Sequence, residues 1–178
     1  MKKIGLILLP VLLAACTPKN PVTPTVLATE LTQGILAFYG AYYQGLPQNV
    51  VALDLYSKDL TFDSLGYIRG SGTNLYLSDI FLPLTDKTPA EGVYRCDTTG
   101  AEGTFLPGMD FDGNPTGTYL LQIANNAISR IILCSDSSFV LTREGDTTDI
   151  RFNLMSGRQQ YKVHYRGVLQ YEDRRQHL

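Results

Sequence analysis

The stretch Thr148-Asp149-Ile150-Arg151-Phe152-Asn153-Leu154 alternates polar and apolar side chains without a break. A period of two is typical of a β-strand that buries one face and exposes the other. Ile150, Phe152 and Leu154 would therefore point into a core. The stretch predicts an antiparallel sheet with one solvent-facing side.

The segments on both sides of this stretch extend the predicted sheet. Residues 138–143 would pair with it across the turn Glu144-Gly145-Asp146. The dipeptide Ser156-Gly157 then turns the chain into a further strand at residues 160–171. The inward side chains of that last strand would be Tyr161, Val163, Tyr165 and Leu169.

More strands are predicted earlier in the chain. They are expected at residues 35–42, 49–57, 74–82, 92–96, 118–124 and 128–134. Turn residues separate them, and no long helix is indicated. We therefore expect an all-β fold of about eight strands, either an antiparallel β-sandwich or a small meander β-barrel.

One of these strands contains an irregularity. Between Asn74 and Leu82 the apolar positions move from Leu75 and Leu77 to Ile80 and Leu82, which changes their parity. An extra residue in the strand would restore the alternation. A β-bulge near Ser78-Asp79 is therefore predicted.

The N-terminus carries an export signal. Lys2 and Lys3 precede an apolar run that is too short to span a bilayer, which takes about 20 helical residues. The motif Leu13-Ala14-Ala15-Cys16 resembles the bacterial lipobox, which implies cleavage before Cys16 and lipidation of that cysteine. The alternative is an ordinary secretory signal followed by an incidental cysteine.

These features divide the chain into four parts. Residues 1–15 are the expected signal peptide, and residues 16–25 are the lipidated cysteine and a linker with proline at every third position. Such a linker favours extended polyproline II and could lift the domain roughly 28 Å from the membrane. Residues 26–171 are the expected β domain, and residues 172–178 a polar tail. We expect a lipoprotein of the cell envelope that is anchored in the outer membrane. Its β domain could lie on either the periplasmic side or the cell-surface side.

Six short fragments occur in a characteristic order along the predicted β domain. They are Ala41-Tyr42-Tyr43, Ala52-Leu53-Asp54-Leu55-Tyr56, Gly92-Val93-Tyr94, Gly103-Thr104-Phe105, Gly117-Thr118-Tyr119-Leu120 and Phe139-Val140-Leu141-Thr142-Arg143-Glu144-Gly145-Asp146. This order is similar to that in uncharacterised β-rich lipoproteins of Bacteroidota, over residues 35–171. Some such lipoproteins carry acidic residues after the lipidated cysteine as a surface-export signal, which Thr17-Pro18-Lys19-Asn20 lacks. The resemblance supplies no catalytic residues.

Two cysteines lie beyond Cys16. In an exported chain Cys96 and Cys134 could form a disulfide, which would stabilise the fold by roughly 4 kcal/mol in the chain-entropy model. They could equally be two buried free thiols that pack as small apolar side chains. Both alternatives stay open.

A row of basic side chains is the first candidate binding site. Lys162, His164 and Arg166 alternate along the last strand, and Arg151 would join them from the neighbouring strand. Such a row could bind a phosphate or a carboxylate of an envelope partner. The alternative is a solvated strand face whose charges discourage edge pairing.

A group of tyrosines near the first predicted hairpin is the second candidate site. Tyr39, Tyr42 and Tyr43 could stack on sugars or anchor a protein partner if their rings are exposed. Core packing and cross-strand pairing would explain the same residues.

No enzyme motif is present. The sequence lacks a Gly-x-Ser-x-Gly elbow, a His-Glu-x-x-His pair and a phosphate-binding glycine loop. We therefore expect a non-enzymatic binding or structural domain whose partner is an envelope protein or a glycan, without cofactor, metal or nucleic acid. A lipocalin-like carrier with an apolar ligand inside a barrel is the alternative, and an envelope hydrolase with paired carboxylates stays open.

Overall fold

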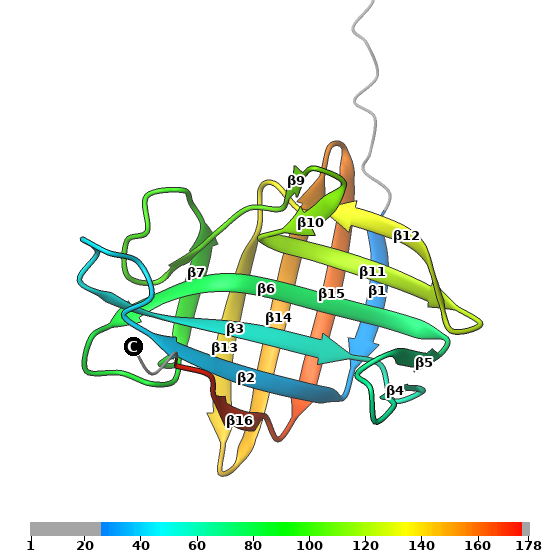
Figure 1. Cartoon of the computed structure of the whole chain (residues 1–178), viewed down its shortest axis with the longest axis horizontal. Helices are drawn as coiled ribbons and strands as arrows, with labels where there is room; N and C mark the ends of the chain where they lie inside the picture. Colours follow the sequence, from blue (N-terminus) through cyan, green and yellow to red (C-terminus); the bar gives the residue numbers. More distant parts are fainter. Residues whose placement is uncertain (1–25, 176–178) are drawn as a thin grey trace, which may run out of the picture.

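The computed structural model describes residues 26–175, which form sixteen β-strands and no helix (Figure 1). Within this range no helix is long and apolar enough to cross a membrane. The signal segment, Cys16 and the proline-rich linker lie outside the described residues. An all-β fold is confirmed.

The strands alternate with short turns along the whole described range. Their bounds are β1 (Val26–Leu31), β2 (Gln33–Gly40), β3 (Gln48–Tyr56), β4 (Leu60–Phe62), β5 (Ile68–Gly70), β6 (Gly72–Pro83), β7 (Gly92–Cys96), β8 (Thr104–Phe105), β9 (Met109–Phe111), β10 (Asn114–Thr116), β11 (Thr118–Ala124), β12 (Ala127–Leu133), β13 (Ser138–Glu144), β14 (Thr147–Ser156), β15 (Gln159–Gly167) and β16 (Gln170–Asp173).

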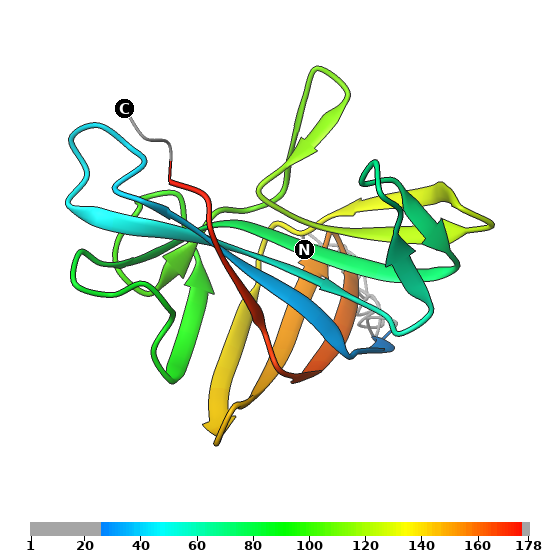
Figure 2. The ribbon, with the colours of Figure 1, turned by 60° about the horizontal axis from the view of Figure 1, so that its bottom comes forward.

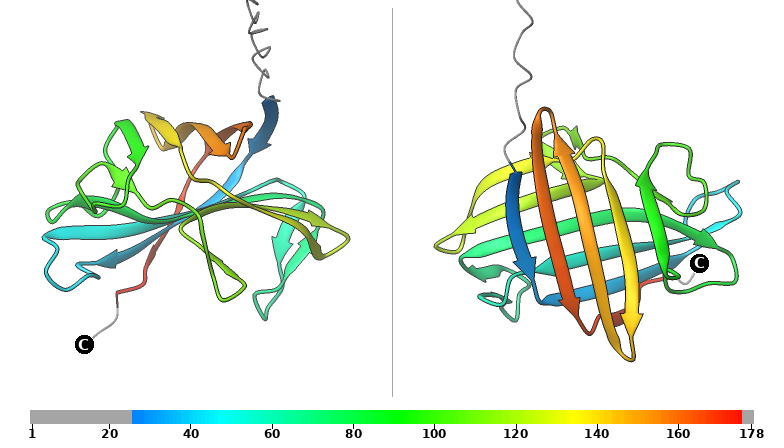
Figure 3. Two further views of the ribbon diagram at one scale, coloured as in Figure 1. Left: turned by 90° about the horizontal axis from the view of Figure 1, so that it is seen from above. Right: turned by 180° about the vertical axis from the view of Figure 1, so that it is seen from behind.

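Twelve of these strands form one strongly curled sheet, a half-barrel with two layers. The front layer contains β2, β3, β6, β11 and β12, and the back layer contains β1, β15, β14, β13 and β7. In the view from behind, the back strands lie nearest the viewer and run steeply across the front strands (Figure 3, right). At one corner β1 leads into β2 through Thr32 alone, and on the other side β8 joins β7 to β6.

The finer fold prediction was wrong in strand number and in pairing. The sheet is mixed, because β1 pairs with β15, β16 with β2 and β7 with β8 in parallel. An eight-strand antiparallel sandwich or meander does not contain such pairs. Parallel partners far apart in sequence leave no local turn signal, so alternation alone could not indicate them.

The core lies between the two layers. The predicted inward residues Ile150, Phe152 and Leu154 are all buried there. From the front layer, Leu53 and Leu77 face them and are fully buried. The concave side of the half-barrel is therefore filled by apolar side chains.

The predicted β-bulge is confirmed. Between β3 and β6 the register advances by two residues from Val51 to Leu53 but by three from Leu77 to Ile80. Asp79 adopts a left-handed conformation with φ of 55°. The bulge therefore lies at Ser78-Asp79 and leaves the apolar side chains on both sides of it facing the core.

Two hairpins project from the outer face of the front layer. Hairpins β4–β5 and β9–β10 leave this face on the side away from the back layer (Figure 2 and Figure 3, left). Gly108 and Gly117 make the base of β9–β10 compact, because a Cβ at Gly108 would lie 2.1 Å from the Thr118 carbonyl oxygen and one at Gly117 would lie 1.8 Å from that of Pro107. Hairpins β4–β5 and β9–β10 therefore flank the outer face of the front layer.

Candidate functional site

A cavity of about 290 Å³ opens on the outer face of the front layer, beside the loop between β2 and β3. It is called the tyrosine pocket below. The side chains that define it are Tyr39, Tyr42, Tyr43, Tyr76, Asp79 and Arg174. Strands β2 and β6, the loop and the end of the chain each contribute to it. The pocket thus collects the three tyrosines that the sequence singled out.

The tyrosine rings support one another. Tyr42 is 53% exposed, and its ring meets Tyr39 and Tyr43 edge to face at centroid distances of 6.0 and 5.1 Å. Tyr43 in turn packs on the buried ring of Phe81 at 6.0 Å. An exposed aromatic surface is therefore held on a core residue, which reduces the entropy lost when a ligand stacks on it.

The bulge places a carboxylate in this pocket. Asp79 accepts a hydrogen bond of 2.9 Å from the Ser78 hydroxyl, and the Tyr43 hydroxyl lies within hydrogen-bonding reach. Burial raises the pKa of Asp79, although these two hydrogen bonds act to lower it. Burial, followed by the charge of Asp79, raises the pKa of Tyr43 to about 12. The protonated Tyr43 hydroxyl therefore faces the Asp79 carboxyl group, whose oxygens can accept further hydrogen bonds.

The end of the chain contributes a guanidinium group. The backbone N–H of Arg174 donates to the carbonyl of Phe38 at 2.8 Å, which fixes the residue after β16 against β2. Its side-chain Nε and Nη2 donate to one oxygen of Glu172 at 2.9 and 2.6 Å. These bonds, and then the Tyr39 hydroxyl, raise the pKa of Arg174. Arg174 is therefore an oriented donor at the rim.

These groups match a polyhydroxylated ligand. An aromatic face packs against the C–H face of a sugar ring, while a carboxylate accepts and a guanidinium donates hydrogen bonds to hydroxyl groups. Within residues 26–175 no cluster of three or more His, Cys, Asp or Glu side chains could hold a metal ion. The tyrosine pocket could therefore stack a sugar ring on its aromatic side chains and orient the sugar by hydrogen bonds to its hydroxyl groups.

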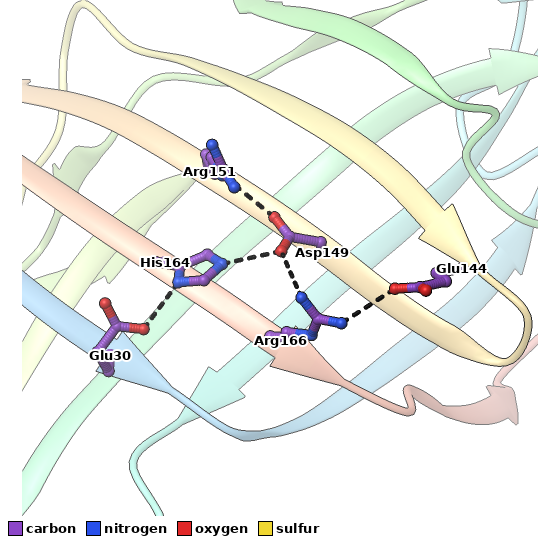
Figure 4. Close-up of polar contacts among 6 residues, drawn as sticks. All are labelled: Glu30, Glu144, Asp149, Arg151, His164 and Arg166. Carbon is purple, nitrogen blue, oxygen red and sulfur yellow. Dashed lines mark hydrogen bonds and ion pairs between the residues drawn. The ribbon is translucent and has the colours of Figure 1, made fainter.

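The predicted basic row lies on the outward face of β14 and β15, and Figure 4 shows its members Arg151, His164 and Arg166. Its charges are largely compensated by acids. Arg151 lies 3.4 Å from Asp149, and Arg166 lies 3.0 Å from Glu144. Among residues 26–175, Lys162 is the one member of the row without a carboxylate within ion-pair distance.

His164 makes two of these contacts. Its Nδ1 lies 2.8 Å from Glu30 of β1, and its Nε2 lies 3.1 Å from Asp149 of β14. Burial would raise the pKa of Asp149, but the hydrogen bond and charge of His164, with Arg151, lower it. The parallel pairing of β1 with β15 brings Glu30 to this row. The ion pairs of the row join four strands, β1, β13, β14 and β15, and leave little free positive charge.

Cys96 and Cys134 are free thiols. Cys96 donates a hydrogen bond to the carbonyl of Ser135 at 3.3 Å, whereas Cys134 is fully buried in the core. Burial raises the pKa of Cys96 to about 11 and that of Cys134 to about 12. Both groups are poor thiolates in the folded chain. The disulfide stays a prediction for the oxidised protein.

Sequence reasoning missed three residues of the tyrosine pocket. Asp79 was identified as a bulge residue, but nothing local indicated which group its carboxylate would face. Tyr76 belongs to a predicted strand whose outward face had no assigned role. Arg174 was placed in a polar tail, because the preceding strand β16 is short and pairs in parallel with a distant partner. Only long-range pairing collects these side chains.

The chain matches no protein-family model, no curated protein and no solved structure.

Proposed function

We propose that the chain is a membrane-anchored, non-enzymatic binding protein of the bacterial cell envelope, and that its tyrosine pocket binds carbohydrate. The pocket carries this proposal, because an exposed ring held by two others lies beside a carboxylate and a guanidinium group. Stacking and hydroxyl recognition are then available within one cavity of about 290 Å³.

The two other candidate sites have less support. The basic row is occupied by Glu30, Glu144 and Asp149, so an incoming anion would have to compete with them. The carrier alternative needs an empty apolar interior. Leu53, Leu77, Phe152 and the rest of the core occupy the concave side of the half-barrel. A ligand on the outer face requires no rearrangement of that core.

The sequence motif at Cys16 supports the location. Lipidation after Leu13-Ala14-Ala15 would attach the chain to a membrane, for which we propose the outer membrane, as in the β-rich lipoproteins of Bacteroidota that it resembles. A single acyl chain anchors only marginally, so the stable attachment proposed here needs the two or three chains of a bacterial lipoprotein. The envelope contains abundant glycans.

A glycan array tests the proposal. The lipidated chain that begins at Cys16, solubilised in detergent, should bind a restricted set of saccharides. Tyr42→Ala should lower that signal by about tenfold, equivalent to about 1.4 kcal/mol. Tyr67→Ala is the matched control, because Tyr67 is 61% exposed but lies outside the tyrosine pocket. No saccharide binding, or equal loss in both variants, would refute the proposal.

A further inference from the structure

The tyrosine pocket lies at one end of a row of side chains across the front layer. Tyr76 of β6 pairs directly with Tyr119 of β11, and their rings lie 5.3 Å apart. The Tyr39 hydroxyl is within hydrogen-bonding reach of Tyr76, across the small side chain of Ala52. Tyr119 in turn pairs with Leu133 of β12. These residues line one path across neighbouring strands on the outer face.

A second cavity lies at the other end of this path. It has a volume of about 160 Å³ and lies beneath hairpin β9–β10, where Asp110 and Pro115 face Ile131 and Leu133. The compact glycine base described above holds that hairpin against β11 and β12. Two separate concavities are thus joined by a strip of tyrosine rings.

The length of the path is set by strand spacing. From β2 through β3, β6 and β11 to β12 there are four steps between neighbours. At about 4.8 Å a step the path spans roughly 19 Å. That distance exceeds the length of one pyranose ring, so a single sugar would occupy only part of it.

The path carries the carboxylates Asp54 and Asp79, which accept from the neutral donors Asn74 and Ser78, and one guanidinium group that is already ion-paired. Asp54 accepts a hydrogen bond of 2.5 Å from the Asn74 amide, and its burial raises its pKa. Arg174 is paired with Glu172, and Asp79 lies beside two hydroxyl donors. An acidic ligand would find no free cation among these groups and would meet two carboxylates. An uncharged polar chain would gain stacking without displacing an ion pair.

We infer that the outer face of the front layer binds a linear, neutral oligosaccharide, with one end in the tyrosine pocket and the chain extending over Tyr76 and Tyr119 to hairpin β9–β10. This inference rests on the proposed carbohydrate binding and adds the size and charge of the ligand. Affinity should therefore increase with the number of sugar units.

Calorimetric titration of the lipidated chain with neutral glucose and N-acetylglucosamine oligomers of one to six units, and with galacturonic acid oligomers as an acidic series, tests the inference. In whichever neutral series binds, the hexamer should bind about tenfold more tightly than the dimer. Ile131→Arg would fill the cavity under β9–β10, and should reduce hexamer affinity to that of the dimer while leaving dimer affinity unchanged. Ile128→Arg is the control, because Ile128 is exposed on the same strand but lies outside that cavity.

The outcomes separate the two proposals. Equal affinity for all lengths in the unmodified chain, or an Ile131→Arg variant with full hexamer affinity, would overturn the extended site and leave the tyrosine pocket intact. Tighter binding of acidic oligomers than of neutral ones would overturn the assignment of a neutral ligand. Failure of every oligomer to bind would overturn carbohydrate binding itself, and the extended site with it.

Discussion

Tyr42 and Tyr43 meet edge to face with their ring centroids 5.1 Å apart. The contact joins an exposed ring to one that packs on the core residue Phe81. The Tyr43 hydroxyl also reaches the Asp79 carboxylate. A ligand on Tyr42 would therefore bind a surface whose geometry is set before binding.

The backbone at the bulge gives a first prediction. Asp79 has a φ of 55°, a conformation that glycine adopts freely and alanine does not. Asp79→Gly and Asp79→Ala both remove the carboxylate, so their difference isolates backbone strain. We expect Asp79→Gly to be more stable than Asp79→Ala by about 1 kcal/mol in urea unfolding. Equal stability would show that the left-handed conformation is not maintained in solution.

A buried hydroxyl gives a second prediction. Tyr165 is fully buried, and its hydroxyl has no hydrogen-bond partner among the described residues. Tyr165→Phe should leave the free energy of unfolding unchanged or raise it by up to about 1 kcal/mol. Tyr161→Phe is the control, because that buried hydroxyl donates to Gln159 at 2.6 Å and its loss should cost about 1 kcal/mol. A larger loss in Tyr165→Phe than in Tyr161→Phe would contradict this account.

Acid should weaken the contacts around His164. Because the folded pKa of Asp149 is lowered, its contribution to stability is complete above its ordinary pKa of about 3.9 and is lost as the pH falls through the lower folded value. The stability difference between the unmodified chain and Asp149→Asn should therefore shrink as the pH falls below about 4. Urea unfolding at several pH values measures this, and a difference independent of pH down to pH 2 would be inconsistent with the ion-pair geometry.

The anchor prediction concerns a residue outside the described range. Cys16→Ser should abolish metabolic labelling with palmitate and release the chain from the membrane fraction. Cys96→Ser is the control, because Cys96 lies in the β domain and should not affect labelling. Membrane attachment that persists in Cys16→Ser would refute the lipoprotein assignment.

Local sequence predicted the parts of the fold that depend on near neighbours. The alternation around Ile150 and the hairpin across Gly145 are confirmed by the antiparallel register of β13 and β14. Between β11 and β12, Asn125 and Asn126 both adopt left-handed conformations, as a tight hairpin turn requires. Each of these features is encoded in fewer than about ten consecutive residues.

Features that depend on distant pairing could not be predicted. The contact between Glu30 and His164 requires β1 to lie parallel to β15, and the position of Arg174 requires β16 to lie beside β2. No turn connects these strands, so the sequence offers no register for them. In the tyrosine pocket the sequence indicated Tyr39, Tyr42 and Tyr43, but it did not indicate Tyr76, Asp79 and Arg174.

The most direct test of the central claim is the dissociation constant of a neutral oligosaccharide for the unmodified chain and for Asp79→Gly, measured by calorimetry. This variant removes the carboxylate from the tyrosine pocket while its backbone tolerates the bulge. Carbohydrate binding in the pocket predicts affinity lower by about tenfold or more, equivalent to about 1.4 kcal/mol. The same dissociation constant for both proteins would contradict it.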